Sequence, residues 1–368
     1  MKKLGFGCMR LPLLDNNNKA SVDPIAFNAL IDRFISLGGT YFDTAYFYHG
    51  GASESFVKRC LVERYPRDRF QLATKLFMTE LKSRQHAEDM FQEQLDRCGV
   101  EFFDYYLLHN INDENYKKAV EFKCFELQQE MKAAGKIKRA GFSFHGSAAL
   151  LDTVLTAHPE TEFVQLQLNY LDWEDSNVQS RLCYEVARKH GKDVIVMEPC
   201  KGGELATVPD EAMALMKAVH PDATPASWAF RYVGALEGVI MVLSGMNALE
   251  QVEENCAVLD SALSMSEEEL AVIAKTVAII DAVTPVKCTA CRYCEEGCPM
   301  NIPIPDCFGL YNRYARTKVE NLKNSYRFRT EGKGKASECI ACSACVGKCP
   351  QNLPIPELLK DVAAALEC

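Results

Sequence analysis

Eight of the 17 cysteines form two copies of one spacing in the last quarter of the chain. The first copy is Cys288, Cys291, Cys294 and Cys298, and the second is Cys339, Cys342, Cys345 and Cys349. Both read C-x2-C-x2-C-x3-C-P, and the octapeptides that begin at Cys298 and Cys349 also match, as CPMNIPIP and CPQNLPIP. In a chain of 368 residues, thiols gathered in this way indicate metal or redox chemistry rather than disulfides.

This spacing is typical of cysteines that bind [4Fe-4S] clusters. Three closely spaced thiolates can cover one face of an iron–sulfur cube, and in two-cluster ferredoxins the fourth cysteine of each run binds the other cluster. Structural zinc sites normally combine two C-x2-C pairs and need no third nearby cysteine. We therefore predict two clusters, one held by Cys288, Cys291, Cys294 and Cys349 and the other by Cys339, Cys342, Cys345 and Cys298.

The cysteine-rich segment is predicted to form a small domain over residues 283–368. Residues 306–326 between the copies have a helical pattern, with Phe308, Tyr311, Tyr314 and Ala315 on one side, which favours an α-helical ferredoxin-like domain. The segment carries 12 Lys and Arg against 9 Asp and Glu, although the whole chain has a net charge of -9. Its basic residues either balance the charge of the clusters or form a docking surface, and both interpretations are open.

Charge and hydropathy exclude two classes of partner. A net charge of -9 does not suit a generally basic nucleic-acid-binding protein. No apolar segment approaches the length that spans a bilayer, and the apolar run near the N-terminus is interrupted by glycine, arginine and proline. We expect a cytoplasmic protein that binds neither nucleic acid nor membrane.

Residues 1–282 alternate short β-type runs with longer amphipathic segments. Strands are predicted over Leu4–Cys8, Tyr41–Asp43, Phe70–Lys75, Phe103–His109, Ile137–Phe142, Phe163–Leu168, Val194–Met197 and Val239–Leu243. Helices are predicted between them, including 24–37, 84–98, 115–134 and 178–190. Repeated βα units of this number and length predict an α/β fold, a (β/α)8 TIM barrel. A doubly wound sheet is the alternative, but no G-x-G-x-x-G follows the first strand.

Polar side chains gather where the predicted strands end, which is where such barrels carry out their chemistry. They are Asp43, Tyr48, Lys75, His109, Ser143, Gln165, Asn169, Glu198 and Ser244. A single aspartate at a strand end commonly caps the next helix, and a single histidine is commonly just hydrogen-bonded. Four titratable groups at one rim, Asp43, Tyr48, Lys75 and His109, favour an active site.

Several motifs resemble those of the aldo/keto reductases. Phe42-Asp43-Thr44-Ala45-Tyr46-Phe47-Tyr48, Ala73-Thr74-Lys75 and Leu107-Leu108-His109 resemble the active-site motifs of that family. Further matches are Gly141-Phe142-Ser143, Gln165-Leu166-Gln167, and Ser244-Gly245-Met246-Asn247 followed by Gln251, Glu254 and Asn255. The resemblance covers about residues 1–282, and the cysteine-rich tail makes the whole chain similar to the iron–sulfur branch of the family.

The resemblance implies reduction of a small-molecule carbonyl with a hydride from NAD(P)H. Tyr48 would be the general acid, Asp43 would hold Lys75 in place, and His109 would orient the carbonyl. A free phenol titrates near about 10, so we expect the Lys75 cation to lower the pKa of Tyr48. The cofactor would be bound by Ser143, Gln165, Ser244, Gly245, Met246, Gln251, Glu254 and Asn255.

The cofactor positions depart from the family pattern. Phe144 stands where an asparagine is expected, and Met197 stands where a tyrosine usually stacks on the nicotinamide. Met246 and Asn247 stand where a basic residue usually binds the 2′-phosphate of NADP, and phosphate recognition favours Arg or Lys. The sequence therefore predicts little preference for NADP over NAD.

Three functions follow from these features. The first is an aldo/keto reductase-like oxidoreductase with two electron-transferring clusters and a ferredoxin-type or flavoprotein partner. The second is a flavin-dependent reductase with FMN in the barrel mouth, because flavin converts between hydride chemistry and the one-electron chemistry of clusters. The third is a non-catalytic electron carrier or redox sensor, against which the complete set of Asp43, Tyr48, Lys75 and His109 argues.

Overall fold

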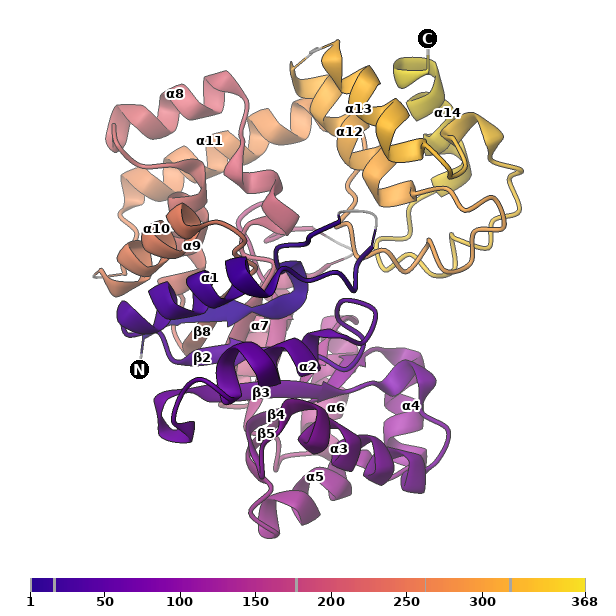
Figure 1. Cartoon of the computed structure of the whole chain (residues 1–368). Coiled ribbons are helices and arrows are strands. Elements are labelled where there is room, and N and C mark those ends of the chain that lie inside the picture. The colour runs from indigo at the N-terminus through magenta and orange to yellow at the C-terminus, as the bar shows by residue number, and fades with distance from the viewer. Residues whose placement is uncertain (1, 16–17, 176–177, 262, 318–319, 368) are drawn as a thin grey trace. The chain divides into compact units, whose positions relative to one another are not determined.

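The computed structural model describes residues 2–15, 18–175, 178–261, 263–317 and 320–367. By its internal contacts the chain forms two compact units (Figure 1). The first comprises residues 1–199 and 227–265, and the second comprises residues 200–226 and 266–368. The division predicted between residues 282 and 283 stays a prediction.

The first unit contains a closed barrel of eight parallel strands, which confirms the predicted α/β barrel. The strands are β1 (Leu4–Gly7), β2 (Tyr41–Asp43), β3 (Gln71–Leu76), β4 (Phe103–Ile111), β5 (Ile137–Phe144), β6 (Phe163–Gln167), β7 (Asp193–Met197) and β8 (Val239–Ser244). Each strand pairs with the next in the chain, and β8 closes the barrel by pairing with β1 through Leu4 and Val242. All eight predicted strands are therefore present, with ends that differ by a few residues.

Every strand of the barrel is followed by one or two helices. They are α1 (Pro24–Ser36), α2 (Ser53–Val57), α3 (Arg84–Cys98), α4 (Asp113–Glu121), α5 (Cys124–Ala133), α6 (Ala148–Ala157), α7 (Ser180–Lys189), α8 (Asp210–Val219), α9 (Pro225–Gly234) and α10 (Leu249–Asp260). The single helix predicted over residues 115–134 is wrong, because Lys123 has a left-handed φ of 53° that separates α4 from α5.

Strand alternation explains how the barrel positions polar groups at one rim. Successive residues of a strand point to opposite faces, so every second residue points into the barrel. The buried interior contains large apolar side chains from alternate positions, such as Tyr41, Tyr105 and Phe163. Two residues further along, the same face carries Asp43 on β2 and Gln165 on β6, and four residues after Tyr105 it carries His109 on β4. The interior thus changes from apolar packing to polar groups toward the carboxyl ends of the strands.

Gly5 of β1 shows how tightly the interior is packed. A Cβ atom at this position would lie 2.7 Å from Cδ2 of Leu243 and 2.9 Å from Cδ1 of Tyr41. Outside the same strands, the rings of Phe6, Phe34 and Phe42 pack with centroids 5.3 to 5.7 Å apart. Glycine at position 5 therefore leaves room for the aromatic interior.

The second unit contains α8 together with α11 (Glu267–Val283), α12 (Ile304–Thr317), α13 (Asn321–Thr330) and α14 (Ile355–Leu366). Helices α12 and α14 begin at equivalent Ile-Pro pairs of the repeated sequence, so the duplication is visible in the fold. The helical pattern predicted over 306–326 is found in α12, which ends at Thr317, and α13, which begins at Asn321, while residues 318–319 lie outside the described residues. Within the described residues, no helix is long and apolar enough to cross a membrane.

The core of the second unit is small and lies between its last three helices. Phe308, Tyr326, Leu359, Val362 and Leu366 are almost completely buried there. The side chains of Tyr311 and Tyr314 pack against this core with partial burial, as the helical pattern predicts. Several cluster-type cysteines contact the same core, so the helices and the cysteine loops form one packed unit.

Candidate active site and cluster sites

A buried ion pair lies at the base of the barrel rim. The Lys75 Nζ donates to Asp43 Oδ1 at 2.6 Å and to the carbonyl oxygen of Thr44 at 2.7 Å. The Lys75 side chain is fully buried and that of Asp43 is 3% exposed. Burial raises the pKa of Asp43, and the Lys75 ammonium opposes this effect. Asp43 Oδ2 has no hydrogen-bond partner among the described residues, so the pair retains one free acceptor.

Tyr48 lies in the loop that follows β2, and its side chain is buried. The Lys75 Nζ lies 5.0 Å from the centre of the Tyr48 ring, over its face. Burial raises the pKa of Tyr48 well above its usual value, and the Asp43 carboxylate raises it further. The expected lowering of this pKa is therefore not found, because burial and the negative charge of Asp43 dominate. At neutral pH the phenol keeps its proton.

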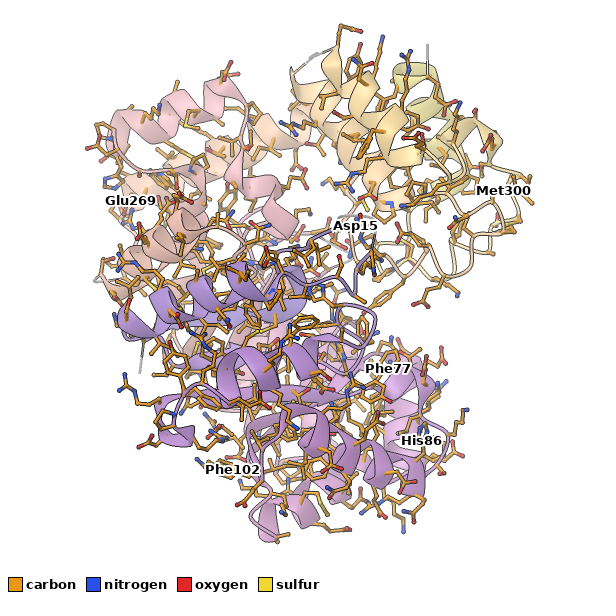
Figure 2. The ribbon with its side chains drawn as sticks, in the orientation of Figure 1. Asp15, Phe77, His86, Phe102, Glu269 and Met300 are labelled. Carbon is orange, nitrogen blue, oxygen red and sulfur yellow. The ribbon has the colours of Figure 1, made fainter. Side chains whose placement is uncertain are left out.

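His109 on β4 stands beside Tyr48 and is also buried. Its ring stacks on Phe47 with centroids 5.2 Å apart and contacts Phe77, labelled in Figure 2, at 6.4 Å. Burial lowers the pKa of His109 well below its usual value, and the positive charge of Lys75 adds to the effect. The imidazole is therefore neutral at pH 7. Its Nδ1 has no hydrogen-bond partner among the described residues.

A second layer of polar groups supports Lys75 from outside the barrel. Glu54 Oε1 accepts hydrogen bonds from Thr74 Oγ1 and from Gln94 Nε2, both at 2.7 Å. Gln94 Nε2 also donates to the carbonyl oxygen of Lys75 at 3.0 Å. Sequence analysis missed Glu54 and Gln94. The available signal was that Gln94 falls on the apolar face of α3, whose other members, such as Phe91, are buried.

Arg10 and Glu198 form an ion pair at the rim. The sequence analysis named Glu198 but not Arg10. Arg10, directly after β1, has its Nη2 atom 3.3 Å from Oε1 of Glu198, which follows β7. Glu198 has a left-handed φ of 57°, and its Oε2 is buried without a hydrogen-bond partner among the described residues. The positive charge of Arg10 lowers the pKa of Tyr48, whereas Glu198 raises it. The neighbouring Asn169 donates from Nδ2 to the Glu198 carbonyl oxygen at 3.2 Å.

Two of the expected cofactor residues, Ser143 and Gln165, lie on the adjacent strands β5 and β6. Ser143 has a hydrogen-bond partner within the protein, whereas one polar atom of Gln165 has none among the described residues. The Ser143 hydroxyl accepts a hydrogen bond from the Asn110 backbone N–H at 2.8 Å. Gln165 is buried and places Nε2 3.6 Å from the sulfur of Met197, while its Oε1 has no partner among the described residues. An unpaired buried carbonyl oxygen is costly, so Gln165 is suited to accept a hydrogen bond from a bound molecule. Phe144 is buried next to Ser143.

The remaining cofactor candidates lie between β8 and α10. Asn255 Nδ2 donates to the Ser244 hydroxyl at 3.2 Å, and Gln251 Oε1 accepts from the Asn247 backbone N–H at 2.9 Å. Gly245 and Asn247 are exposed and Glu254 is partly exposed, but Met246 is fully buried. No Lys or Arg occurs between Ser244 and Asn255, so this turn offers no cationic side chain to a 2′-phosphate.

The charge effects of the cysteines on one another stay within each predicted set of four, and the crossed ligation itself stays a prediction. In the first set, the charges of Cys291 and Cys349 raise the pKa of Cys288, and Cys349 acts in the same way on Cys291 and Cys294. In the second set, Cys339, Cys298 and Cys342 raise the pKa of Cys345. Burial is the largest cause in each case.

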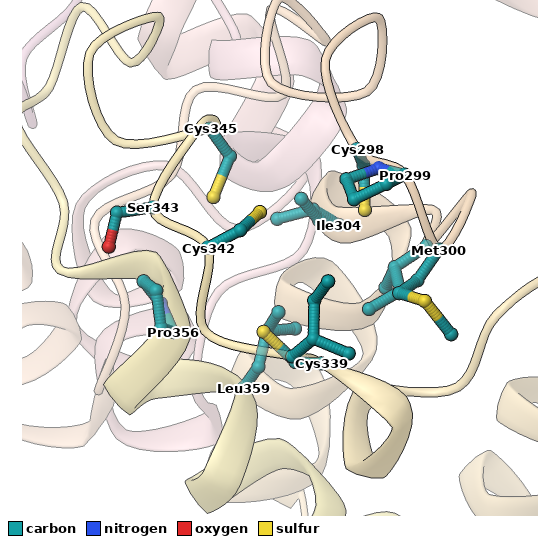
Figure 3. A pocket seen from close by; sticks show the side chains of 12 residues that line it. Cys298, Pro299, Met300, Ile304, Cys339, Cys342, Ser343, Cys345, Pro356 and Leu359 are labelled. Atoms are coloured by element: carbon teal, nitrogen blue, oxygen red, sulfur yellow. The ribbon is translucent and has the colours of Figure 1, made fainter.

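The second set surrounds a single pocket, drawn in Figure 3. Cys298, Cys339, Cys342 and Cys345 line it together with Ile304, Pro356 and Leu359, and the figure shows the sulfurs around one space. Across the described part of the chain, no three Cys, His, Asp or Glu side chains form a group that could hold a single metal ion. Four thiols around an apolar-walled pocket fit the donor set of a [4Fe-4S] cluster.

Comparisons with known proteins agree with this architecture. The sequence model of the 4Fe-4S dicluster domain matches residues 287–353. The uncharacterized oxidoreductase YqkF of Bacillus subtilis is 23% identical over 303 residues, which cover 73% of this chain and 90% of YqkF. Norsolorinic acid reductase stcV of Emericella nidulans is 29% identical over 128 residues, which cover 31% of this chain and 32% of stcV.

Solved structures show the same fold. The aldo-keto reductase AKR11C1 of Bacillus halodurans has a TM-score of 0.60 at 24% identity, over 74% of this chain and 91% of that protein. An aldo-keto reductase of Klebsiella pneumoniae in complex with NADPH has a TM-score of 0.59 at 21% identity, over 74% and 90%. The sequence model of the aldo/keto reductase family matches residues 3–277. The chain therefore belongs to the aldo/keto reductase family and is an oxidoreductase of that family with a C-terminal 4Fe-4S dicluster domain.

Proposed function

We propose that the barrel reduces the carbonyl group of a small molecule with a hydride from NADH or NADPH, and that two [4Fe-4S] clusters exchange electrons with a partner protein. The observation that carries the first part is the buried group at one rim: a protonated Tyr48, a neutral His109 and the Asp43–Lys75 ion pair. Membership of the aldo/keto reductase family supports the same reaction.

Each rim residue has a role that its surroundings support. Tyr48 keeps its proton at neutral pH and donates it to the carbonyl oxygen as negative charge develops there. Lys75, held by Asp43 and the Thr44 carbonyl, places a positive charge next to the Tyr48 ring, which stabilises the phenolate that remains. His109 is neutral and can donate a hydrogen bond that orients and polarises the carbonyl.

The nicotinamide, when bound, supplies the hydride. Gln165 would accept a hydrogen bond from its carboxamide at the unpaired Oε1, and Ser143 lies on the next strand. The turn between Ser244 and Asn255 would hold the adenosine end without a charged contact to a 2′-phosphate. We therefore expect NADH and NADPH to bind with similar affinity. The NADPH complex of the Klebsiella pneumoniae relative supports a nucleotide in a barrel of this fold.

The clusters would serve electron transfer rather than structure alone. The dicluster match and the two sets of four cysteines support two clusters in one domain. Cysteine-bound clusters normally pass one electron at a time, so the partner is expected to be a one-electron carrier such as a ferredoxin-type protein or a flavoprotein.

One observation favours a second candidate, a flavin-dependent reductase. Met197 lies against Gln165, where a stacking aromatic side chain is absent, and Phe144 replaces a polar residue beside Ser143. Both changes weaken the contacts to nicotinamide and leave apolar side chains that an isoalloxazine ring could contact. In this case FMN would take electrons from the clusters, and no nicotinamide would be required.

The two candidates are separated by identifying the nucleotide that binds. For protein purified without oxygen, the first candidate predicts that NADH or NADPH quenches the protein fluorescence and that denaturation releases little flavin. It also predicts that the protein oxidises the nucleotide when an aldehyde or ketone from a test panel is added. Flavin released in near one-to-one ratio with the chain, with no nicotinamide binding, would replace the first candidate by the second.

A further inference from the structure

The two copies of the cysteine motif differ in exposure, although their sequences are related by duplication. Residues 289–293 of the first copy are all buried or partly buried, whereas the equivalent residues 340–344 of the second copy are all exposed. Thr289 is 7% exposed and its equivalent, Ile340, is 60% exposed. The second cluster site therefore presents a surface loop, defined here as Ile340–Ala344, that the first does not.

Contacts within the second unit explain why the first copy is covered. The Arg292 side chain pairs with Asp306 on α12 and with Glu295, the latter through Nη1 at 2.8 Å. Cys288 and Ala290 line a cavity whose other wall includes the segment 201–209. In the second copy, Ser343 replaces Arg292 and Ala344 replaces Tyr293, so the side chains that could cover the loop are missing.

The second copy also differs in charge. The first copy has Glu295, Glu296 and Gly297 before its last cysteine, and the second copy has Val346, Gly347 and Lys348 instead. At these positions the second copy therefore has two carboxylates fewer and one lysine more than the first.

Two further lysines, Lys333 and Lys335, precede the second copy. Lys333, Lys335 and Lys348 are all exposed, and the positive charge of Lys335 acts on the Glu367 carboxylate. The nearby Glu338 is bound to the backbone N–H of Lys335 at 2.8 Å. The loop Ile340–Ala344 thus begins with an exposed apolar side chain, and it has Lys333, Lys335 and the exposed Glu338 before it in the sequence and Lys348 after it.

We propose that the loop Ile340–Ala344, with Lys333, Lys335 and Lys348, is the docking surface for an acidic electron-transfer protein. This inference rests on the electron-transfer part of the proposed function. Cys339, Cys342, Cys345 and Cys298 would hold a cluster that accepts one electron from the reduced partner in each encounter, with no proton or bond involved. The cysteines of the first copy would hold a second cluster, to which that electron could pass within the same unit.

Physical arguments favour an acidic partner with an apolar centre in its docking face. Exposed lysines attract a negatively charged protein over long distances and increase its association rate, and this effect weakens with salt. Interfaces combine an apolar core with a polar rim, and the loop offers the exposed Ile340 with lysines on both sides of it in the sequence. A basic partner would be repelled by the same three charges.

The test follows reduction of the oxidised holoprotein by its visible absorbance in a stopped-flow instrument, without any carbonyl substrate. The probe is a reduced plant-type [2Fe-2S] ferredoxin, an acidic one-electron carrier, and reduced methyl viologen serves as a small reductant that needs no docking surface. The double variant Lys335→Glu/Lys348→Glu should slow reduction by ferredoxin at least about tenfold at low salt and should flatten its salt dependence. Reduction by viologen should not change.

A matched control uses the first copy. Lys287 is an exposed lysine directly before Cys288, and Lys287→Glu should leave both rates unchanged. A variant without a charge change, Ile340→Ser, should slow reduction of the holoprotein by ferredoxin but not by viologen. Iron analysis verifies that each variant keeps its clusters. Equal rates for the double variant and the unmodified protein, or slowing by Lys287→Glu alone, would overturn the docking surface. Protein without iron and sulfide would instead contradict the proposed function.

Discussion

The barrel rim and the cysteine loops of the second unit differ in how their functional groups are partnered. At the rim, buried polar groups bind one another: Lys75 is held by Asp43 and Thr44, and its strand by Gln94. In the cluster unit, burial is the largest cause that raises the pKa values of Cys288, Cys294 and Cys345, and the charges of neighbouring cysteines raise them further. At the rim, Lys75 is bound by protein groups, but polar atoms of His109 and Gln165 have no hydrogen-bond partner among the described residues. The cysteine loops are arranged for an iron–sulfur group.

This difference has a consequence for stability. The barrel closes its own hydrogen bonds and core around the rim, so its fold needs no metal. The cysteine loops contain little regular structure between α11 and α12 and between α13 and α14, and they contact a small core. Metal binding contributes folding free energy in small domains of this kind. We therefore expect loss of the clusters to affect the second unit far more than the first.

The largest effect should come from removing a single cluster ligand. Cys298→Ala should remove the cluster bound by Cys339, Cys342 and Cys345, so that iron falls from about eight to about four atoms per chain. The matched control is Cys307→Ala, because Cys307 is buried in the same core but lies outside both sets of four. Iron and sulfide analysis of protein purified without oxygen measures the result. A full complement of iron in Cys298→Ala would refute the crossed ligation.

The next largest effect tests whether Tyr48 at the rim donates the proton in carbonyl reduction. Tyr48→Phe removes one hydroxyl from a side chain that packs by its ring, so the fold should be retained while carbonyl reduction falls about 10²–10⁴-fold. Tyr46→Phe is the control, since the Tyr46 hydroxyl donates to Glu93 on the surface at 3.0 Å. Steady-state rates of the two variants decide the point. Equal activity of Tyr48→Phe and the unmodified protein would exclude Tyr48 as the proton donor.

Sequence reasoning reached the barrel and its rim because both depend on local periodicity. Alternation along strands such as β2 and β3 indicates which residues share the interior, and the parallel barrel then brings their ends together. Breaks inside helices had no such signal: the left-handed Lys123 lies in a sequence without glycine or proline. Glu54 and Arg10 were missed because their partners lie on other elements, 20 and 188 positions away in the sequence.

A smaller effect tests the ion pair that the rim buries. Lys75→Met leaves the Asp43 carboxylate buried without its partner, which should cost about 3–5 kcal/mol of barrel stability. The double variant Lys75→Met/Asp43→Asn removes both charges and should recover a large part of this loss. Urea unfolding of the three proteins gives the free energies. No recovery in the double variant would mean that lost packing of Lys75, rather than an unpaired Asp43, causes the destabilisation.

The smallest expected effect is on the preference for NADPH over NADH, because the turn between β8 and α10 has no Lys or Arg. The exposed Asn247 is the position from which a new cation could reach a 2′-phosphate, so Asn247→Arg should increase the preference for NADPH over NADH by about tenfold or more. Met246 lies next to it but is fully buried, so Met246→Lys should lower stability without giving this preference. Fluorescence titrations with both nucleotides measure the ratio of dissociation constants in each protein. Strong selectivity for NADPH in the unmodified protein would show that a cation elsewhere in the chain binds the 2′-phosphate, and that the turn between β8 and α10 does not decide the choice of nucleotide.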